Sequence, residues 1–121
     1  MTPLERLLED ARSGLDRVEP VDYDRVVSAG ALVVDIRPEA IRRRDGDLPG
    51  ALAIGLNVLE WRLAPESEHR ALDVDPARVV LLVCSEGYSS SLAAHRLQLV
   101  GLPRATDLVG GFQALLAHRS G

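Results

Sequence analysis

Hydrophobic positions along the chain form short continuous runs, separated by segments in which they recur every three or four residues. The continuous runs are rich in β-branched and aliphatic residues, which is typical of buried strands. We predict strands over residues 31–38, 51–54, 79–84 and 105–109. The periodic segments predict helices over residues 2–16, 21–28, 38–44, 57–63, 90–100 and 110–118. Because strands alternate with helices, the pattern predicts an α/β fold with a mostly parallel sheet and helices on both faces.

The first predicted helix carries its own start signal. Thr2 can cap it, Pro3 suits the first helical position, and Glu5 completes a capping box with Thr2. The chain has 121 residues, which fits one domain and leaves little room for two. We therefore expect one domain over residues 1–121, with residues 1–17 as a helical extension packed on it.

The charge balance narrows the range of partners. The formal net charge is −4, and the only basic cluster, residues 42–44, is followed at once by Asp45 and Asp47. Nucleic acids and anionic membranes attract basic patches, so we expect neither as a partner. No apolar run approaches the ~20 residues that span a bilayer, and no signal peptide is visible. We expect a cytoplasmic protein.

The chain contains one cysteine and three widely spaced histidines. A single cysteine cannot form an internal disulfide, and the histidine spacing matches no metal-ligand pattern. We expect neither a metal site nor a cofactor, and leave open whether the chain forms a homodimer.

Cys84 is the main candidate for chemistry. It ends the most continuously apolar predicted strand, and a short loop separates it from the next predicted helix. Ligands of open α/β sheets bind outside the carboxyl ends of the strands, and a helix N-terminus favours anions. A thiol in this position is expected to have a lowered pKa and to be nucleophilic. The alternative is a small buried hydrophobic residue that ends a core strand.

The loop after Cys84 has the composition of an anion cradle. Gly87 lets successive amides turn inward, and the exposed loop tip is expected at Tyr88. Ser85, Ser89 and Ser90 add hydroxyl donors to the same centre. Serine is also a preferred N-cap, so we expect Ser89 or Ser90 to cap the following helix.

Four segments, in order along residues 18–118, resemble motifs of the rhodanese family of sulfurtransferases. Val33–Arg37 resembles its Asp-x-Arg strand motif, and Gly46–Ala51 resembles Gly-His-Ile-Pro-Gly-Ala. Cys84–Ser90 resembles the active-site loop Cys-x-x-Gly-x-Arg-Ser, and Leu108–Phe112 resembles Leu-x-Gly-Gly. The resemblance implies a rhodanese-like α/β fold with a sheet of about five strands.

The resemblance also implies an activity. The family cysteine accepts sulfane sulfur as a persulfide and passes it to a nucleophile. Carried over, Cys84 is the nucleophile, and the loop Ser85, Glu86, Gly87, Tyr88, Ser89 and Ser90 cradles a small anionic donor such as thiosulfate. The acceptor would be a thiol or cyanide, and the chain would be an enzyme of the thiosulfate sulfurtransferase class.

The chain departs from the family pattern at two positions. Ser89 stands where the loop arginine is usual, and Asp47 stands where histidine is usual. Loss of the arginine removes a cation for the donor, and Glu86 adds a carboxylate to the loop. The missing arginine and the added carboxylate both oppose thiosulfate as the preferred donor.

Asp35 and Arg37 alternate with apolar residues at the end of a predicted strand and can reach the same edge as Cys84. A structural ion pair is favoured over a role in binding substrate, because buried charges are usually paired.

Two other functions compete with sulfur transfer. One is a non-catalytic binding or sulfur-sensing module with the same fold. The other is a phosphatase or arsenate reductase, whose Cys-x5-Arg loop would require arginine at the position of Ser90.

Overall fold

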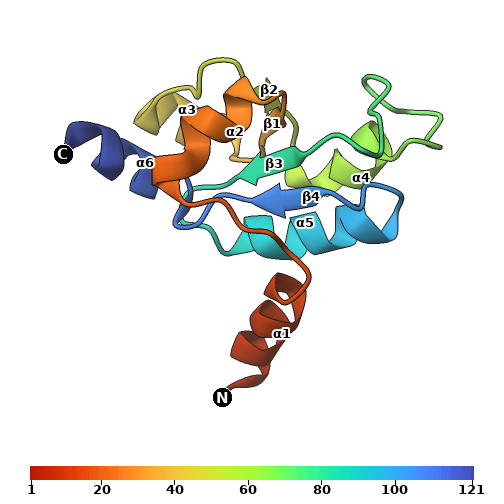
Figure 1. The fold of residues 1–121 in the computed structure, drawn as a ribbon, viewed down its shortest axis with the longest axis horizontal. Coiled ribbons are helices and arrows are strands. Elements are labelled where there is room, and N and C mark those ends of the chain that lie inside the picture. Colours follow the sequence, from red (N-terminus) through yellow and green to blue (C-terminus); the bar gives the residue numbers. More distant parts are fainter.

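The computed structural model describes residues 1–121 and contains one parallel sheet (Figure 1). Its strands are β1 (Leu32–Asp35), β2 (Leu52–Ala53), β3 (Val80–Val83) and β4 (Ala105–Asp107), in the order β2-β1-β3-β4. Every neighbouring pair is parallel. All four residues of the central strand β3 are buried, as expected for a strand covered on both faces.

Six α-helices and two short 3₁₀ segments connect and flank these strands. They are α1 (Pro3–Arg12), η1 (Pro20–Asp22), α2 (Tyr23–Ser28), α3 (Glu39–Asp45), η2 (Leu56–Val58), α4 (Leu59–Leu63), α5 (Ser89–Leu99) and α6 (Gly111–Ser120). None of the helices is both long and apolar enough to cross a bilayer.

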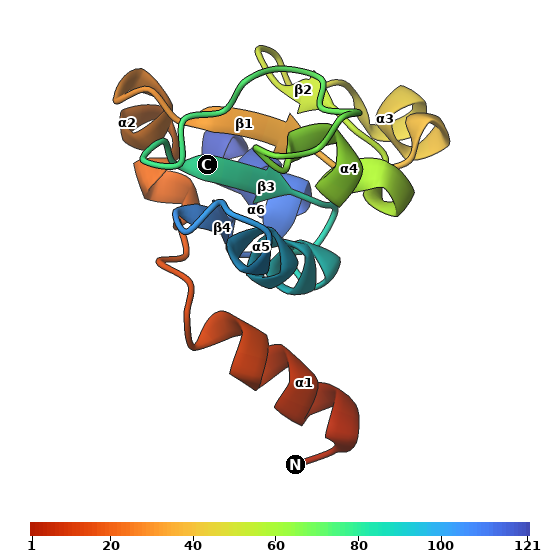
Figure 2. The same ribbon diagram turned by 90° about the vertical axis from the view of Figure 1, so that its right-hand side faces the viewer.

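The sheet separates two hydrophobic cores. On one face, Leu59 and Leu63 of α4 and Leu97 of α5 pack with β-strand residues such as Leu82. On the other face, α2 and α6 contribute residues such as Phe112. Helices therefore cover both faces of the sheet (Figure 2), and the predicted α/β fold is confirmed.

The expected number of about five strands is wrong, because the sheet has four. Beyond β4, one isolated parallel bridge joins Val18 to Leu108. The ladder stops there because the chain turns at Glu19-Pro20 into η1, and proline has no N–H to donate.

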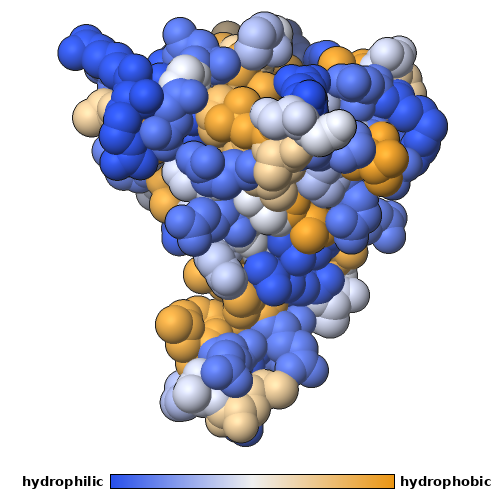
Figure 3. Space-filling view, turned by 90° about the vertical axis from the view of Figure 1, so that its left-hand side faces the viewer, coloured by the Kyte–Doolittle hydropathy of each residue, from blue (hydrophilic) through white to orange (hydrophobic).

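The N-terminal helix α1 stands apart from the sheet (Figures 1 and 2). The capping box between Thr2 and Glu5 forms as predicted. The helix ends at Arg12 rather than at residue 16, because Ser13 and Gly14 are poor helix formers. Its surface carries exposed apolar side chains, among them Leu4 and Leu7. Hydrophobic residues are visible on the lower part of the molecule in Figure 3.

Candidate active site

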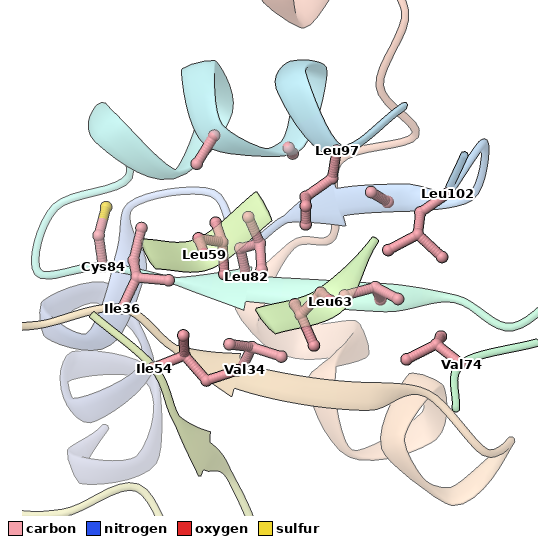
Figure 4. Close-up of a cluster of buried hydrophobic side chains, with 14 residues drawn as sticks. Val34, Ile36, Ile54, Leu59, Leu63, Val74, Leu82, Cys84, Leu97 and Leu102 are labelled. Atoms are coloured by element: carbon pink, nitrogen blue, oxygen red, sulfur yellow. The ribbon is translucent and has the colours of Figure 1, made fainter. Parts of the chain in front are cut away.

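Cys84 immediately follows β3 and is buried, with 6% of its surface exposed. It lies at the end of the core between the sheet and α5, beside Ile36 (Figure 4). Its sulfur points toward the side of the sheet that α5 covers (Figure 4). The strand thus delivers the thiol to the carboxyl edge of the sheet, where open α/β folds bind ligands.

Two groups from the following loop and helix contact the Cys84 sulfur. The Gly87 N–H donates to Sγ over 3.1 Å, and Ser90 Oγ lies 3.2 Å from Sγ. Burial alone raises the pKa of the Cys84 thiol. Hydrogen bonds from the Ser90 hydroxyl and backbone, the Ser89 hydroxyl and the Gly87 backbone outweigh burial, and lower the pKa below the ordinary value of 9.0. The thiolate is therefore favoured by donors rather than by a neighbouring cation in the loop.

Gly87 adopts a backbone conformation that only glycine takes easily. Its φ is +83°, and a Cβ at this position would lie 2.7 Å from the Gly110 nitrogen. Gly110-Gly111 therefore packs directly against the loop that carries Gly87. Gly110 and Gly111 have positive φ angles of +71° and +64°, and a Cβ at Gly111 would lie 2.5 Å from the Cys84 carbonyl oxygen.

The start of α6 supports the other side of the loop. The Phe112 N–H donates to the Cys84 carbonyl over 2.8 Å, and the Gln113 N–H donates to the Ser85 carbonyl over 3.0 Å. The first N–H groups of a helix have no partner within the helix, so α6 satisfies its own donors by holding this loop.

A buried carboxylate organises the α5 side of the site. Asp107, at the end of β4, is fully buried. Ser90 Oγ donates to Asp107 Oδ2 over 2.7 Å and Ser91 Oγ donates to it over 2.8 Å. Arg17 pairs with the same carboxylate over 2.8 Å and 3.2 Å. Ser90 thus lies between Asp107 and Cys84, and links the carboxylate to the sulfur.

Sequence reasoning missed Asp107, Ser91 and Arg17. Asp107 ends a strand beside β3, and parallel strands end at the same edge, so its position was the available signal. Arg17 lies in a segment between a helix and a 3₁₀ turn, where no pattern marks its partner.

Asp35 and Arg37 form a buried ion pair with a shortest N–O distance of 2.7 Å. Arg37 also donates to the Gly46 carbonyl over 2.9 Å and lies 3.7 Å above the centroid of the Phe112 ring. Because the Phe112 N–H holds the Cys84 carbonyl, the ion pair supports the loop from the α6 face. This is the structural arrangement that the sequence favoured.

An open cavity of about 610 Å³ lies at this edge of the sheet. From the predicted loop, Cys84, Ser85, Glu86, Tyr88 and Ser89 line it, together with Ile36, Arg37, Pro38, Gly55, Leu56 and Asn57. With Arg37, the structure therefore brings six of the predicted site residues to one cavity. Gly87 and Ser90 are buried and contact the sulfur instead. Residues 55–57 were missed, since a turn of ordinary composition carries no signal of its own.

The expected serine cap of α5 is wrong. The helix begins at Ser89, and its N-cap is Tyr88, whose side chain makes no capping hydrogen bond. Ser90 and Ser91 lie inside the first turn, and both hydroxyls are bound to Asp107. These hydroxyls therefore donate to the buried carboxylate and do not cap the N-terminus of α5. No group of three or more His, Cys, Asp or Glu side chains is placed to hold a metal ion.

Ser90→Ala is expected to raise the pKa of Cys84, because the thiolate loses the hydrogen bond of the Ser90 hydroxyl. Loss of a hydrogen bond to a charged group lowers the fraction of thiolate at neutral pH, and the alkylation rate should fall by about tenfold. The measurement is the pH dependence of Cys84 alkylation by iodoacetamide. Ser85→Ala is the matched control, because the Ser85 hydroxyl makes no hydrogen bond to Sγ. Superimposable profiles for Ser90→Ala and wild type would contradict this assignment.

The family model for the rhodanese-like domain matches residues 19–118. A rhodanese homolog, TT1651 from the extremely thermophilic bacterium Thermus thermophilus, is 34% identical, with 82% of this chain and 99% of that chain covered and a TM-score of 0.61. Protein RPA3614 from Rhodopseudomonas palustris, described as a possible tyrosine phosphatase of unknown function, is 25% identical, with 98% and 92% covered and a TM-score of 0.84. A search of curated proteins returned no match.

The fold is also shared with a human single-domain sulfurtransferase, TSTD1. That protein is 21% identical, with 84% of this chain and 95% of that chain covered and a TM-score of 0.70. The matched range contains the strand that ends at Asp35, the Cys84 loop and the Gly110-Gly111 segment that holds the loop. With most of its length matched by the family model, this chain belongs to the rhodanese-like domain family.

Proposed function

We propose that this chain is a sulfurtransferase that carries sulfane sulfur as a persulfide on Cys84. The observation that carries the proposal is the pair of hydrogen bonds on the sulfur, in which the Gly87 N–H donates to Sγ over 3.1 Å and the thiol donates to Ser90 Oγ over 3.2 Å. Cys84 also lines an open cavity, so a small donor can approach the buried thiolate. The family membership supports the same reaction class.

The reaction divides into two balanced transfers. The Cys84 thiolate attacks the outer sulfur of a donor such as thiosulfate, the S–S bond of the donor breaks, and sulfite leaves with the bonding electron pair. The product is Cys84–S–S⁻. A thiol or cyanide then attacks the terminal sulfur, and Cys84 leaves as a thiolate. No net proton, oxidant or reductant is consumed in the cyanide case.

The residues of the loop stabilise negative charge through both steps. The Gly87 N–H and the backbone at the start of α5 point toward Sγ, which carries the negative charge before the first transfer and again when the second transfer releases the thiolate. The Ser90 hydroxyl can donate to the thiolate, or to Asp107 when Cys84 is a thiol, because it has one proton for two neighbours. Ser90 can therefore stabilise Cys84 when it is a thiolate and Asp107 when Cys84 is a thiol.

Phosphoryl transfer is less well supported, although one structural neighbour is described as a possible tyrosine phosphatase. Residues 84–90 contain no arginine, and position six after Cys84 is Ser90. The one guanidinium that lines the cavity, Arg37, is already paired with Asp35. A phosphoryl oxyanion would therefore lack the bidentate cation that such loops supply.

The experiment is a steady-state assay that detects thiocyanate after donor and cyanide are added. Thiosulfate, mercaptopyruvate and glutathione persulfide are tested as separate donors. We expect turnover with at least one of them. A folded chain that produces no thiocyanate with any donor would favour the alternative, a non-catalytic binding or sulfur-sensing module.

Glu86→Gln is expected to raise kcat/KM for thiosulfate. Glu86 is exposed, lines the cavity and has no ion-pair partner, so its carboxylate repels an anionic donor. Coulomb repulsion at an exposed site predicts a gain of about twofold to fivefold at low ionic strength, which salt screens. The measurement is kcat/KM at low and high salt, with Glu68→Gln as a control outside the loop and the cavity. An unchanged value at both salts would mean that Glu86 does not select the donor.

A further inference from the structure

Two arginines that lie before the matched range of residues 19–118 contact the Cys84 loop. Arg12 ends α1, and Arg17 lies in the extended segment that joins α1 to the rest of the chain (Figures 1 and 2). Arg12 Nη2 donates to the Gly87 carbonyl over 2.8 Å, and Arg17 Nη2 donates to the same oxygen over 3.1 Å. Two guanidinium groups thus converge on one loop carbonyl.

Each arginine is anchored by a second contact. Arg12 Nε donates to Ser91 Oγ over 3.0 Å, and Arg17 forms its ion pair with Asp107. The segment itself is held beside β4 by two backbone bonds of Val18. Its N–H donates to the Asp107 carbonyl over 3.0 Å, and its carbonyl accepts from the Val109 N–H over 2.8 Å. The arginines are therefore fixed relative to β4 and α5.

The carbonyl that they hold belongs to the residue that donates to the sulfur. Glycine has the widest backbone freedom of any residue type, and the Gly87 N–H is the backbone donor at 3.1 Å from Sγ. Hydrogen bonds to the Gly87 carbonyl restrict the peptide plane that follows its Cα. The contact with the sulfur restricts the peptide plane that precedes it. Orientation of the N–H toward Sγ depends on both.

The other charged groups around the loop either form ion pairs or line the cavity. Asp35 and Arg37 neutralise each other at the end of β1, and Glu86 lines the cavity. Asp107 is paired with Arg17. Arg12 donates hydrogen bonds to the Gly87 carbonyl and to Ser91 Oγ and forms no salt bridge, so its charge is not neutralised by a carboxylate.

We propose that Arg12 and Arg17, together the arginine pair, are positioning residues that complete the active site by holding the Gly87 N–H on the Cys84 sulfur. Neither lines the cavity, so they act through Gly87 rather than on the donor. Arg12, which has no carboxylate partner, places a positive charge at the Gly87 carbonyl, whereas the loop itself has Ser89 where the family arginine is usual. This proposal rests on the proposed function for the identity of the reaction, and on the hydrogen bonds to Gly87 for the role of the two arginines.

The test compares Arg12→Gln with Arg6→Gln, a control on the same helix whose exposed side chain makes no hydrogen bond to the loop. The first readout is the pH profile of Cys84 alkylation by iodoacetamide, which reports the thiolate whether or not sulfur is transferred. In Arg12→Gln we expect the midpoint to move to higher pH and the rate at neutral pH to fall about threefold to tenfold. Arg6→Gln is expected to match wild type.

The second readout is the steady-state transfer assay. Arg12→Gln should lower kcat several-fold while KM for the donor changes little, and Arg12→Lys should restore part of kcat. Arg17→Lys keeps a cation opposite Asp107 but removes the second donor to Gly87, and it should shift the alkylation profile in the same direction. A role of Arg12 confined to anchoring α1 would move neither the profile nor kcat.

Alkylation profiles of Arg12→Gln and Arg17→Lys that both coincide with wild type would overturn the role of the arginine pair, whatever the transfer rate. Absence of sulfur transfer in the wild type, combined with a shifted profile in Arg12→Gln, would overturn the proposed function and leave the arginine pair standing. The two failures are therefore distinguishable in one set of variants.

Discussion

Replacement of Cys84 by serine is expected to abolish sulfur transfer and leave the fold intact. Serine is nearly isosteric with cysteine, and the Gly87 N–H and Ser90 hydroxyl can still contact its oxygen. A serine hydroxyl without a general base is not ionised at neutral pH and cannot hold a persulfide, so kcat should fall on the order of a thousandfold or more. The measurement is thiocyanate production with the best donor.

Thermal unfolding of Cys84→Ser provides the control for that result, since an unchanged melting temperature shows that the loss is chemical. Transfer above background in a folded Cys84→Ser protein would mean that another group accepts the sulfur. The chain has no second cysteine, so such a result would contradict the persulfide mechanism itself.

Asp107→Asn is expected to cost a large share of the stability of the chain. The substitution leaves Arg17 without its anion and turns an amide N–H toward side chains that donate to the carboxylate. Breaking one partner of a buried ion pair costs about 3–5 kcal/mol, against a total of roughly 5–15 kcal/mol for a typical domain. The measurement is urea unfolding at neutral pH.

The control for Asp107→Asn is Asp73→Asn. Asp73 pairs with Arg70 on the surface, with 89% of its side chain exposed, and such pairs contribute little. Equal urea midpoints for Asp107→Asn and wild type would show that the buried network does not stabilise the fold. The role assigned to Ser90 between Asp107 and Cys84 would then lose its physical basis.

The parallel sheet and the place of Cys84 could be predicted because their signals are local. A continuously apolar run identifies β3, and Gly87 and the serines that follow mark a loop before a helix. The placement of the thiol at the carboxyl edge then follows from the α/β pattern. These features need only the periodicity of the chain and the chemistry of neighbouring residues.

The contacts that organise the site could not be predicted in the same way, because their partners are distant in sequence. Asp107 meets Ser90 and Arg17 only after β4 pairs with β3. The Ser90 hydroxyl was expected to cap α5, and this buried carboxylate captures it instead. A buried carboxylate without hydrogen-bond partners costs more free energy than a helix N-terminus without a serine cap, so Ser90 binds Asp107.

The end of α1 shows the same limit at the N-terminal segment. Helical periodicity extends to Leu15, but the helix ends at Arg12, and the following residues bind beside β4. Arg17 gains an ion pair with Asp107 in the extended conformation, and the sequence pattern contains no sign of that partner.

The most direct test of sulfur transfer through Cys84 is intact-mass spectrometry of the wild-type chain, after incubation with a donor and before any acceptor is added. The mechanism predicts a gain of one sulfur atom, located on the peptide that contains Cys84 and lost when cyanide is added, with thiocyanate released. An unchanged mass with every donor, on protein whose Cys84 is still alkylated by iodoacetamide, would contradict it.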